Sequence, residues 1–111
     1  MSKFTIGQKG ELLAKKFLSD KGLKIIKENY RHKKGQVDLI AEDDQTIIFV
    51  EVKYRKNNSF GYPEDFVSEN QKRLIHLCAE NFLLEFPFKK NIRFDIIAIL
   101  DNKIEHFEDA F

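Results

Sequence analysis

The alternation of apolar and polar positions predicts a helix first and then three strands. Apolar residues at helical spacing predict a helix over residues 7–20, and Lys21-Gly22 ends it because glycine accepts the left-handed turn at a helix C-terminus. The residues expected to form its buried stripe are Leu13, Ala14, Phe17 and Leu18. Strands are predicted over residues 23–30, 37–41 and 47–54, and the last two are joined by a polar turn over residues 42–45.

The second half of the chain predicts one long helix and two more strands. After a loop over residues 57–63, a helix is expected over residues 68–85, with Pro87 just beyond its end. Its apolar stripe consists of Leu74, Ile75, Cys78, Phe82 and Leu83. Strands over residues 93–100 and 103–108 follow, joined by a tight Asp101-Asn102 turn. The order α-β-β-β-α-β-β indicates a mixed sheet with packed helices, in the α/β or α+β range, as one domain spanning residues 1–111.

Charged residues interrupt two of these apolar strands. Asp38 lies within the strand 37–41, and Glu51 and Lys53 lie two apart on one face of the strand 47–54. A hairpin register that sets Asp38 opposite Phe49 makes Asp38 and Glu51 diagonal neighbours, roughly 7–8 Å apart. The same register predicts a wholly apolar opposite face, composed of Val37, Leu39, Ile48, Val50 and Val52. Because buried charge is costly unless it is paired or metal-bound, the three polar residues call for an explanation.

One explanation is a divalent cation shared by the two carboxylates. Oxygen ligands suit Mg²⁺ or Mn²⁺, and Lys53 beside them can orient a water or stabilise developing charge. Glu11, at the edge of the first helix's buried stripe, is a candidate fourth member. The ordinary alternatives stay open at this point: Glu51 and Lys53 as a weak ion pair on an edge strand, and Glu11 as a first-turn acid favoured by the helix dipole.

Other charged residues favour structural interpretations. Asp95 within the strand 93–100 is expected to pair with Arg93 on the same face. The run from Arg31 to Lys34 is typical of a solvated loop rather than a binding patch. Cys78 at a core position is expected to act as a small apolar filler.

Composition limits the partners and the compartment. The 111 residues include 19 Lys and Arg against 18 Asp and Glu, so a net charge of +1 gives no global attraction to nucleic acid or membrane. A single cysteine permits no intramolecular disulfide. The N-terminus lacks the apolar stretch of a signal peptide, and no apolar run approaches the ~20 residues that span a bilayer. We therefore expect a cytoplasmic protein without a membrane partner.

The spacing Asp38…Glu51-x-Lys53 is the loose pattern of metal-dependent nucleases, and here it stands within a longer set of motifs. In chain order these are Gly7-Gln8-Lys9-Gly10-Glu11, Asn29-Tyr30-Arg31, Gly35 to Ala41, Phe49 to Arg55, Phe60-Gly61-Tyr62-Pro63, Arg93 to Ile97 and His106 to Phe111. Together they resemble the YraN family of small bacterial endonuclease-like proteins nearly end to end. That family is similar to the archaeal Holliday junction resolvases and, more distantly, to restriction-endonuclease-like folds.

The resemblance implies a central mixed sheet flanked by helices and a nuclease triad of Asp38, Glu51 and Lys53, with Glu11 as the acid of the first helix. Because the resolvases work as dimers, a homodimer is a candidate assembly. Two positions depart from the family pattern. Gln36 stands where a Glu usually precedes the Val-Asp pair, which removes one candidate metal ligand, and Gln71 stands near a frequent Lys.

These observations support a metal-dependent nuclease that acts on structured or branched DNA, with Mg²⁺ or Mn²⁺ at Asp38, Glu51 and, through water, Glu11. The residues expected to contact phosphates are Arg55, Lys56, Lys72 and Arg73. The alternative is a nucleic-acid-binding module that keeps the nuclease fold and cleaves little or not at all. A third interpretation is an adaptor whose Phe107 and Phe111 dock on a partner, although closing the domain's own core is the more ordinary use.

Overall fold

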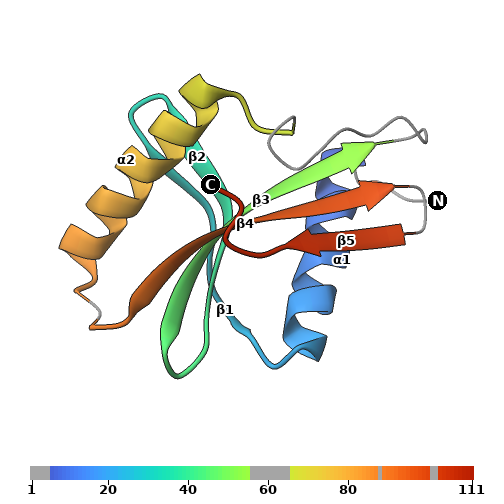
Figure 1. The fold of residues 1–111 in the computed structure, drawn as a ribbon, viewed down its shortest axis with the longest axis horizontal. Helices are drawn as coiled ribbons and strands as arrows, with labels where there is room; N and C mark the ends of the chain where they lie inside the picture. The colour runs from blue at the N-terminus through green and yellow to red at the C-terminus, as the bar shows by residue number, and fades with distance from the viewer. Residues whose placement is uncertain (1–5, 56–65, 88, 101–102) are drawn as a thin grey trace.

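The computed structural model describes residues 6–55, 66–87, 89–100 and 103–111. Within them, helices and strands follow in the predicted order α-β-β-β-α-β-β (Figure 1). Their bounds are α1 (Ile6–Asp20), β1 (Lys24–His32), β2 (Gly35–Glu42), β3 (Thr46–Arg55), α2 (Glu69–Glu85), β4 (Asn91–Leu100) and β5 (Lys103–Phe107). The loop expected over residues 57–63 and the turn at 101–102 lie outside the described residues.

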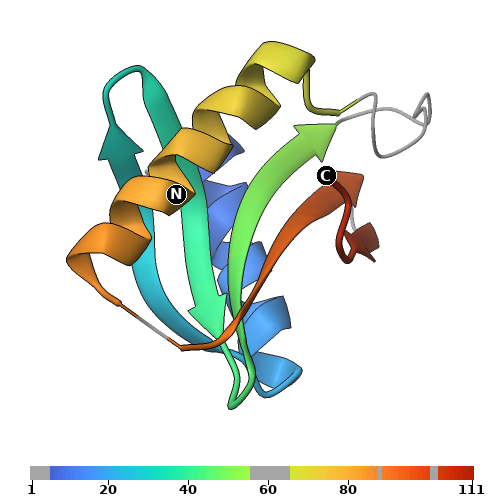
Figure 2. The same cartoon turned by 60° about the vertical axis from the view of Figure 1, so that its left-hand side comes forward.

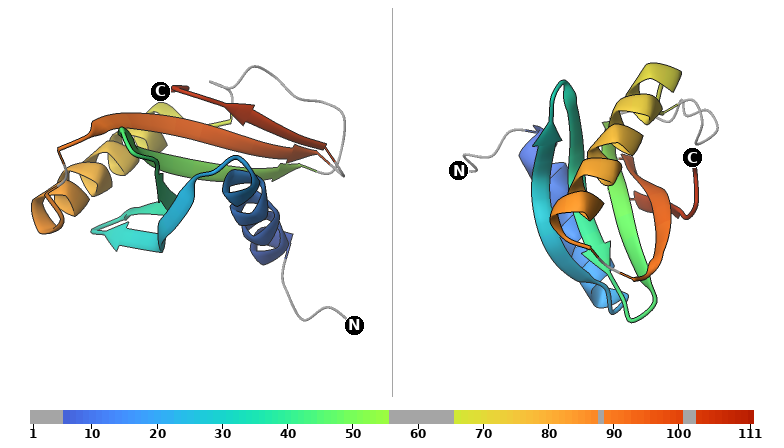
Figure 3. Two further views of the ribbon diagram at one scale, coloured as in Figure 1. Left: turned by 90° about the horizontal axis from the view of Figure 1, so that it is seen from below. Right: turned by 90° about the vertical axis from the view of Figure 1, so that its left-hand side faces the viewer.

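The strands form one mixed sheet in the order β1-β2-β3-β4-β5. Neighbouring strands are antiparallel except β3 and β4, which run parallel from the pair Thr46↔Asn91 to the pair Arg55↔Leu100. A parallel pair needs a crossover connection, and α2 lies in it. The two helices cover opposite faces of the sheet (Figures 2 and 3). The predicted mixed α/β class is therefore confirmed.

Each face of the sheet has its own apolar core. The α2 side includes Ile40, Ile47, Phe49, Ile75 and Phe82, and the α1 side includes Ala14, Leu18, Leu39, Ile48 and Val50. The sheet residues in these lists alternate as the sequence pattern predicts. One helical position differs from the expected stripe, because Leu13 is 43% exposed. Cys78 is buried at the α2 face, as expected of an apolar filler.

The ends of the two helices follow from single residues. Gly22 has φ +88, and the bonds Gly22 N–H to Ser19 O (2.9 Å) and Leu23 N–H to Leu18 O (3.0 Å) close the C-terminus of α1. At α2, the N-cap Ser68 side chain accepts from the Gln71 backbone N–H at 3.1 Å. This cap matters for the site, since it fixes the turn from which the Gln71 side chain projects.

The register of β2 against β3 differs from the predicted one by two residues. Leu39 pairs with Val50 and Ile40 pairs with Phe49, whereas the sequence prediction set Asp38 opposite Phe49. The Asp43 carboxylate accepts from the backbone N–H groups of Gln45 and Thr46, both at 2.8 Å, which places the turn over residues 43–45 instead of 42–45. A shift of two residues keeps side chains on their faces but moves Asp38 from a diagonal position toward a place directly across from Glu51.

β2 pairs with β3 only over Leu39–Glu42, and the two strands diverge beyond that point (Figure 2). The first half of β2, together with β1, instead packs against α2. Gly35 shows this best, because a Cβ there would lie 2.7 Å from the Leu74 carbonyl oxygen. Val37 packs in the α2-side core rather than on the α1 face, so the predicted apolar face is wrong at this position. The divergence creates a fork between β2 and β3.

The C-terminal aromatic residues close the chain's own core. Phe107 and Phe111 pack against the α2-side core, and the Ala110 N–H donates to the Phe94 carbonyl at 2.7 Å. This is the more ordinary of the two uses that the sequence left open. In the part of the chain that the structure describes, neither helix is long and apolar enough to cross a membrane.

Candidate functional site

A pocket of about 290 Å³ opens where β2 and β3 part, with the first turns of α2 on its side. The fold thus gathers two of the three predicted triad residues with a side chain from the second helix. The lining residues are Lys34, Gly35, Gln36, Asp38, Glu51, Gln71, Leu74 and Ile75. Lys53 reaches the same group of side chains through Glu51 and Gln71.

Two hydrogen bonds hold the Asp38 carboxylate, and a third holds one of its two partners in place. Its Oδ2 accepts from the Val52 backbone N–H at 2.8 Å, and its Oδ1 accepts from Gln36 Nε2 at 3.3 Å. Gln36 Nε2 also donates to Asn29 Oδ1 at 3.0 Å. Asn29 has φ +50, a left-handed conformation that Asn tolerates better than most residues. The Asp38 side chain therefore bridges the two strands where their ladder ends.

Glu51 is the buried acid of the pocket, with 5% of its surface exposed. Its Oε2 lies 3.0 Å from Lys53 Nζ and accepts a hydrogen bond from Gln71 Nε2. Burial, followed by the negative charge of Asp38 and a hydrogen bond with it, raises the pKa of Glu51 from 4.5 to about 8, although Lys53 opposes the rise. The exposed ion pair considered from the sequence does not fit a glutamate that is this deeply buried.

Gln71 connects Glu51 and Lys53 of β3, and sequence reasoning did not assign it to the site. Its Oε1 accepts from Lys53 Nζ at 3.4 Å while its Nε2 donates to Glu51. The available signal was the Ser68-x-x-Gln71 spacing, which places residue 71 on the first turn of the helix. The spacing does not indicate where α2 crosses the sheet, and so it could not predict that Gln71 reaches Glu51. Asn29 was missed for a similar reason, because nothing local links it to Gln36 or Glu11.

Glu11 approaches this cluster from α1. Burial and then the charges of Asp38 and Glu28 raise the pKa of Glu11, while Lys15 and a hydrogen bond with Asn29 lower it. Glu11 is thus near enough for the charge of Asp38 to raise its pKa. No group of three or more His, Cys, Asp or Glu side chains that could hold a metal ion occurs among the described residues.

The predicted phosphate contacts are distributed unevenly. Lys72 is paired with Glu69 at 3.1 Å, whereas the Arg73 guanidinium donates to the neutral Asn70 Oδ1 at 2.8 Å. Lys56 and the side chain of Arg55 lie outside the described residues. Of the two candidates whose side chains the structure describes, Arg73 is the one that lines a pocket.

The donor set of the pocket fits a hard divalent cation. Asp38 and Glu51 present carboxylate oxygens, which Mg²⁺ and Mn²⁺ prefer, and Mg²⁺ is commonly bound through one or two carboxylates with water and phosphate. The upward shift of the Glu51 pKa, in part by Asp38, is the repulsion that a cation between two carboxylates would relieve. Asp38 and Glu51 are the residues that would hold the ion, with Glu11 farther out.

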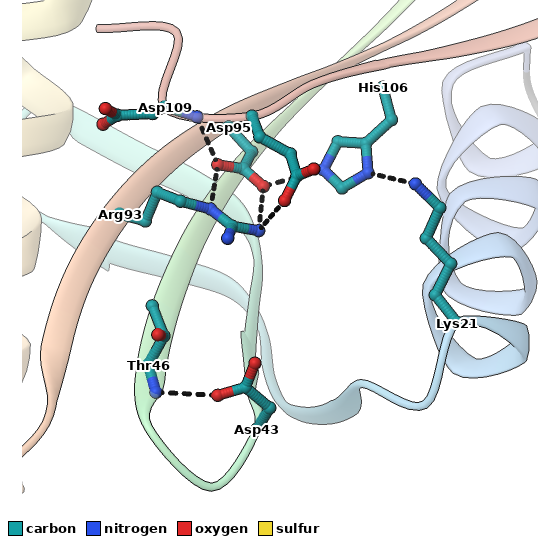
Figure 4. A network of polar contacts seen from close by, with 8 residues as sticks. Lys21, Asp43, Thr46, Arg93, Asp95, His106 and Asp109 are labelled. Carbon is teal, nitrogen blue, oxygen red and sulfur yellow. Dashed lines mark hydrogen bonds and ion pairs between the residues drawn. The ribbon is translucent and has the colours of Figure 1, made fainter.

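A second buried acid, Asp95, lies on the neighbouring strand β4 (Figure 4). Arg93 donates to both of its oxygens at 2.9 Å, His106 Nε2 lies 2.7 Å from Oδ2, and the Asp109 backbone N–H donates to Oδ1 at 2.9 Å. Burial raises the pKa of Asp95, but the hydrogen bonds from these partners outweigh burial and hold the pKa below 3.8. The predicted Arg93–Asp95 pair is confirmed.

The chain is similar to proteins from several bacteria over almost its whole length. Residues 10–99 match the model of a family described as uncharacterised protein family UPF0102. A UPF0102 protein of Persephonella marina is 40% identical over 95% of this chain and 91% of its own length. One from Thermodesulfovibrio yellowstonii is 39% identical over 100% of this chain and 99% of its own, and one from Vibrio parahaemolyticus is 43% identical over 91% and 85%. The chain therefore belongs to the UPF0102 family, which is the YraN family that its motifs predicted.

Proposed function

We propose that this protein is a metal-dependent nuclease that hydrolyses phosphodiester bonds in structured or branched DNA. The observation that supports this most is the half-buried Asp38 beside the buried Glu51, with Lys53 Nζ 3.0 Å from Glu51, at a pocket where two strands separate. Two carboxylates and one ammonium in this arrangement suit metal-assisted attack on a phosphate. A weak surface ion pair explains the triad less well, because it gives no reason for placing a buried acid beside a second acid, where burial makes their repulsion costly.

Each residue of the chain has a distinct part in this proposal. Lys53 carries three N–H donors, of which the contacts with Glu51 and Gln71 use two, so a donor is left for a phosphate oxygen or for the attacking water. Asp38 is oriented by Val52 N–H and Gln36, and Glu51 by Gln71. Mg²⁺ or Mn²⁺, when bound at these carboxylates, would supply Lewis-acid polarisation of the phosphate and of water.

The test is cleavage of matched four-way junction, flap and linear DNA substrates with Mg²⁺ or Mn²⁺. We expect Lys53→Ala to lower the cleavage rate about 10²–10³-fold, the range for loss of one electrostatic donor in an active site. Lys16→Ala, which removes an exposed lysine paired with Asp20 on α1, is the matched control and should cleave as the wild type does. Equal residual cleavage by wild type and Lys53→Ala would show contaminating nuclease and refute the proposal.

One alternative has its own supporting observation. Gln36 and Gln71 are neutral amides that both bond to the acids, to Asp38 and to Glu51. A pocket satisfied in this way suits a nucleic-acid-binding module that has lost cleavage. This alternative predicts that the wild type binds DNA in a salt-dependent way without cleaving it. Asp38→Asn and Glu51→Gln should leave that binding intact.

A further inference from the structure

A second pocket lies next to the candidate site, at the β1–β2 turn. It has a volume of about 320 Å³ and is lined by His32, Lys33, Lys34, Arg73, Leu74 and Leu77. Lys34 and Leu74 line both pockets, so the second pocket adjoins the one that holds the acids of the site. We call the second pocket, defined by these six residues, the basic groove.

The cations of the basic groove have no acidic partner among the residues that the structure describes. Within the described ranges of the chain, no carboxylate lies within ion-pair distance of Lys33, Lys34 or Arg73, and Arg73 contacts only the neutral Asn70. The next residue, Lys72, is paired with Glu69 at 3.1 Å. A net charge of +1 gives the whole molecule no attraction for polyanions, so local positive charge of this kind is what a polyanion would meet.

The turn itself is unusual for its sequence. His32 pairs with Gly35, which leaves Lys33 and Lys34 as a two-residue turn, and Lys33 has φ +54. Glycine or asparagine adopts that conformation with less strain, and residues held in it often serve function. Gly35 fixes the turn against α2, because any side chain there would meet the Leu74 carbonyl oxygen at 2.7 Å. The lysines are therefore held at the groove by the backbone on both sides.

We propose that the basic groove binds the sugar–phosphate backbone of the nucleic-acid strand that leads away from the reacting phosphate. Lys33, Lys34 and Arg73 contact phosphates, and the side chains of Leu74 and Leu77 form the apolar floor for the sugars. The identity of the occupant rests on the proposed function, since it is the position next to the Asp38–Glu51 pocket, with Lys34 and Leu74 shared, that points to nucleic acid. Contacts of this type position a strand and carry no sequence preference.

The experiment measures equilibrium binding of a fluorescent four-way junction and a linear duplex in EDTA, over a series of salt concentrations. Lys34→Ala with Arg73→Ala removes two groove cations. Lys24→Ala with Lys103→Ala removes two exposed lysines from the far end of β1 and from β5 and serves as the matched control. We expect the groove variant to reduce the slope of log affinity against log salt by about 2, and the affinity at low salt at least about tenfold, for both DNAs. The control should match the wild type.

Lys33→Gly separates binding from folding. Glycine suits φ +54, so we expect an unchanged or higher melting temperature together with weaker binding and a slope reduced by about 1. Groove variants that bind as tightly as the control pair would overturn the groove while leaving the nuclease proposal intact. A wild-type protein that binds no DNA at low salt would overturn both.

Discussion

Two buried acids stand on adjacent parallel strands, and their surroundings are opposite. Asp95 on β4 receives bonds from Arg93, His106 and the Asp109 backbone, and these hold its pKa down. Glu51 on β3 has Asp38 beside it, and burial together with that charge raises its pKa to about 8. Asp95 is fully hydrogen-bonded and links β4 to β5 and to the C-terminal segment. Glu51 is repelled by Asp38 and lines a pocket that is open to a ligand. The comparison indicates that the partners of a buried carboxylate, and not its burial alone, decide in which direction its pKa moves.

The pH dependence of folding stability should differ in the same way. The folded-state pKa of Asp95 is lowered, so its ionised form adds stability above 3.8 that is lost as the pH falls through its folded pKa. The folded-state pKa of Glu51 is raised, so its contribution is fully present below 4.5 and is lost as the pH rises toward and through about 8. The two acids therefore limit stability at opposite ends of the pH scale.

The largest expected effect is on folding, from Asp95→Asn. Removing one partner of a buried charge network leaves Arg93 facing a neutral amide, and we expect a loss of about 3–5 kcal/mol in the free energy of unfolding at pH 7, measured by urea denaturation. The control is Glu108→Gln, whose side chain is 57% exposed and pairs with the same Arg93 at 3.0 Å. It should cost about 0.5 kcal/mol or less. Similar losses from both variants would mean that Asp95 is no more structural than a surface acid.

Periodicity was enough to predict the helices and strands and to place Glu51 and Asp95 within apolar strands, because apolar spacing is a local property of the chain. The strand 46–55 and the Arg93–Asp95 pair needed only alternation along one strand. The register of β2 failed because it depends on the Asp43 side chain bonding to backbone N–H groups of its own turn. A two-residue error did not move side chains between faces, which is why Asp38 and Glu51 were still expected together.

The missed parts of the site come from contacts distant in sequence. Gln71 reaches Glu51 only because α2 crosses the sheet beside the fork, and Val37 faces α2 only because β2 leaves β3 beyond Leu39. The run around Lys33 was interpreted as a solvated loop, and Lys33 and Lys34 are indeed exposed. What no local pattern predicts is the position of this turn against α2, which close contact at Gly35 sets.

An intermediate effect is expected from Glu51→Gln, and it concerns pH. In EDTA, the unfolding free energy of the wild type should fall as pH rises from about 4.5 to about 8, because the folded state keeps a proton that the unfolded state releases. The variant cannot ionise, so its profile should be flatter over that window and should exceed the wild type at the alkaline end. Urea denaturation at several pH values measures both profiles.

Added Mn²⁺ sharpens this test. The ion should raise the stability of the wild type most at the alkaline end, where Glu51 is ionised, and should stabilise Glu51→Gln less. Parallel pH profiles for wild type and variant in EDTA would show that burial and Asp38 do not disfavour the charge on Glu51. The contrast with Asp95 would then fail.

The smallest effect is expected from Gln36→Glu, which makes the site more acidic and so widens the contrast with Asp95. Gln36 Nε2 donates to Asp38 Oδ1 at 3.3 Å and to Asn29 Oδ1 at 3.0 Å, and a carboxylate would replace both donors with a third negative charge near Asp38. We expect a loss of about 1 kcal/mol in EDTA and Mn²⁺ affinity about tenfold higher, because the added charge repels the acids and attracts the ion. Thermal melts over a Mn²⁺ titration measure both quantities. Asn29→Asp, which adds a charge one step farther from Asp38, is the control for charge alone. If both variants change Mn²⁺ affinity equally, Gln36 tunes the site only through net charge and its bond to Asp38 has no special part in it.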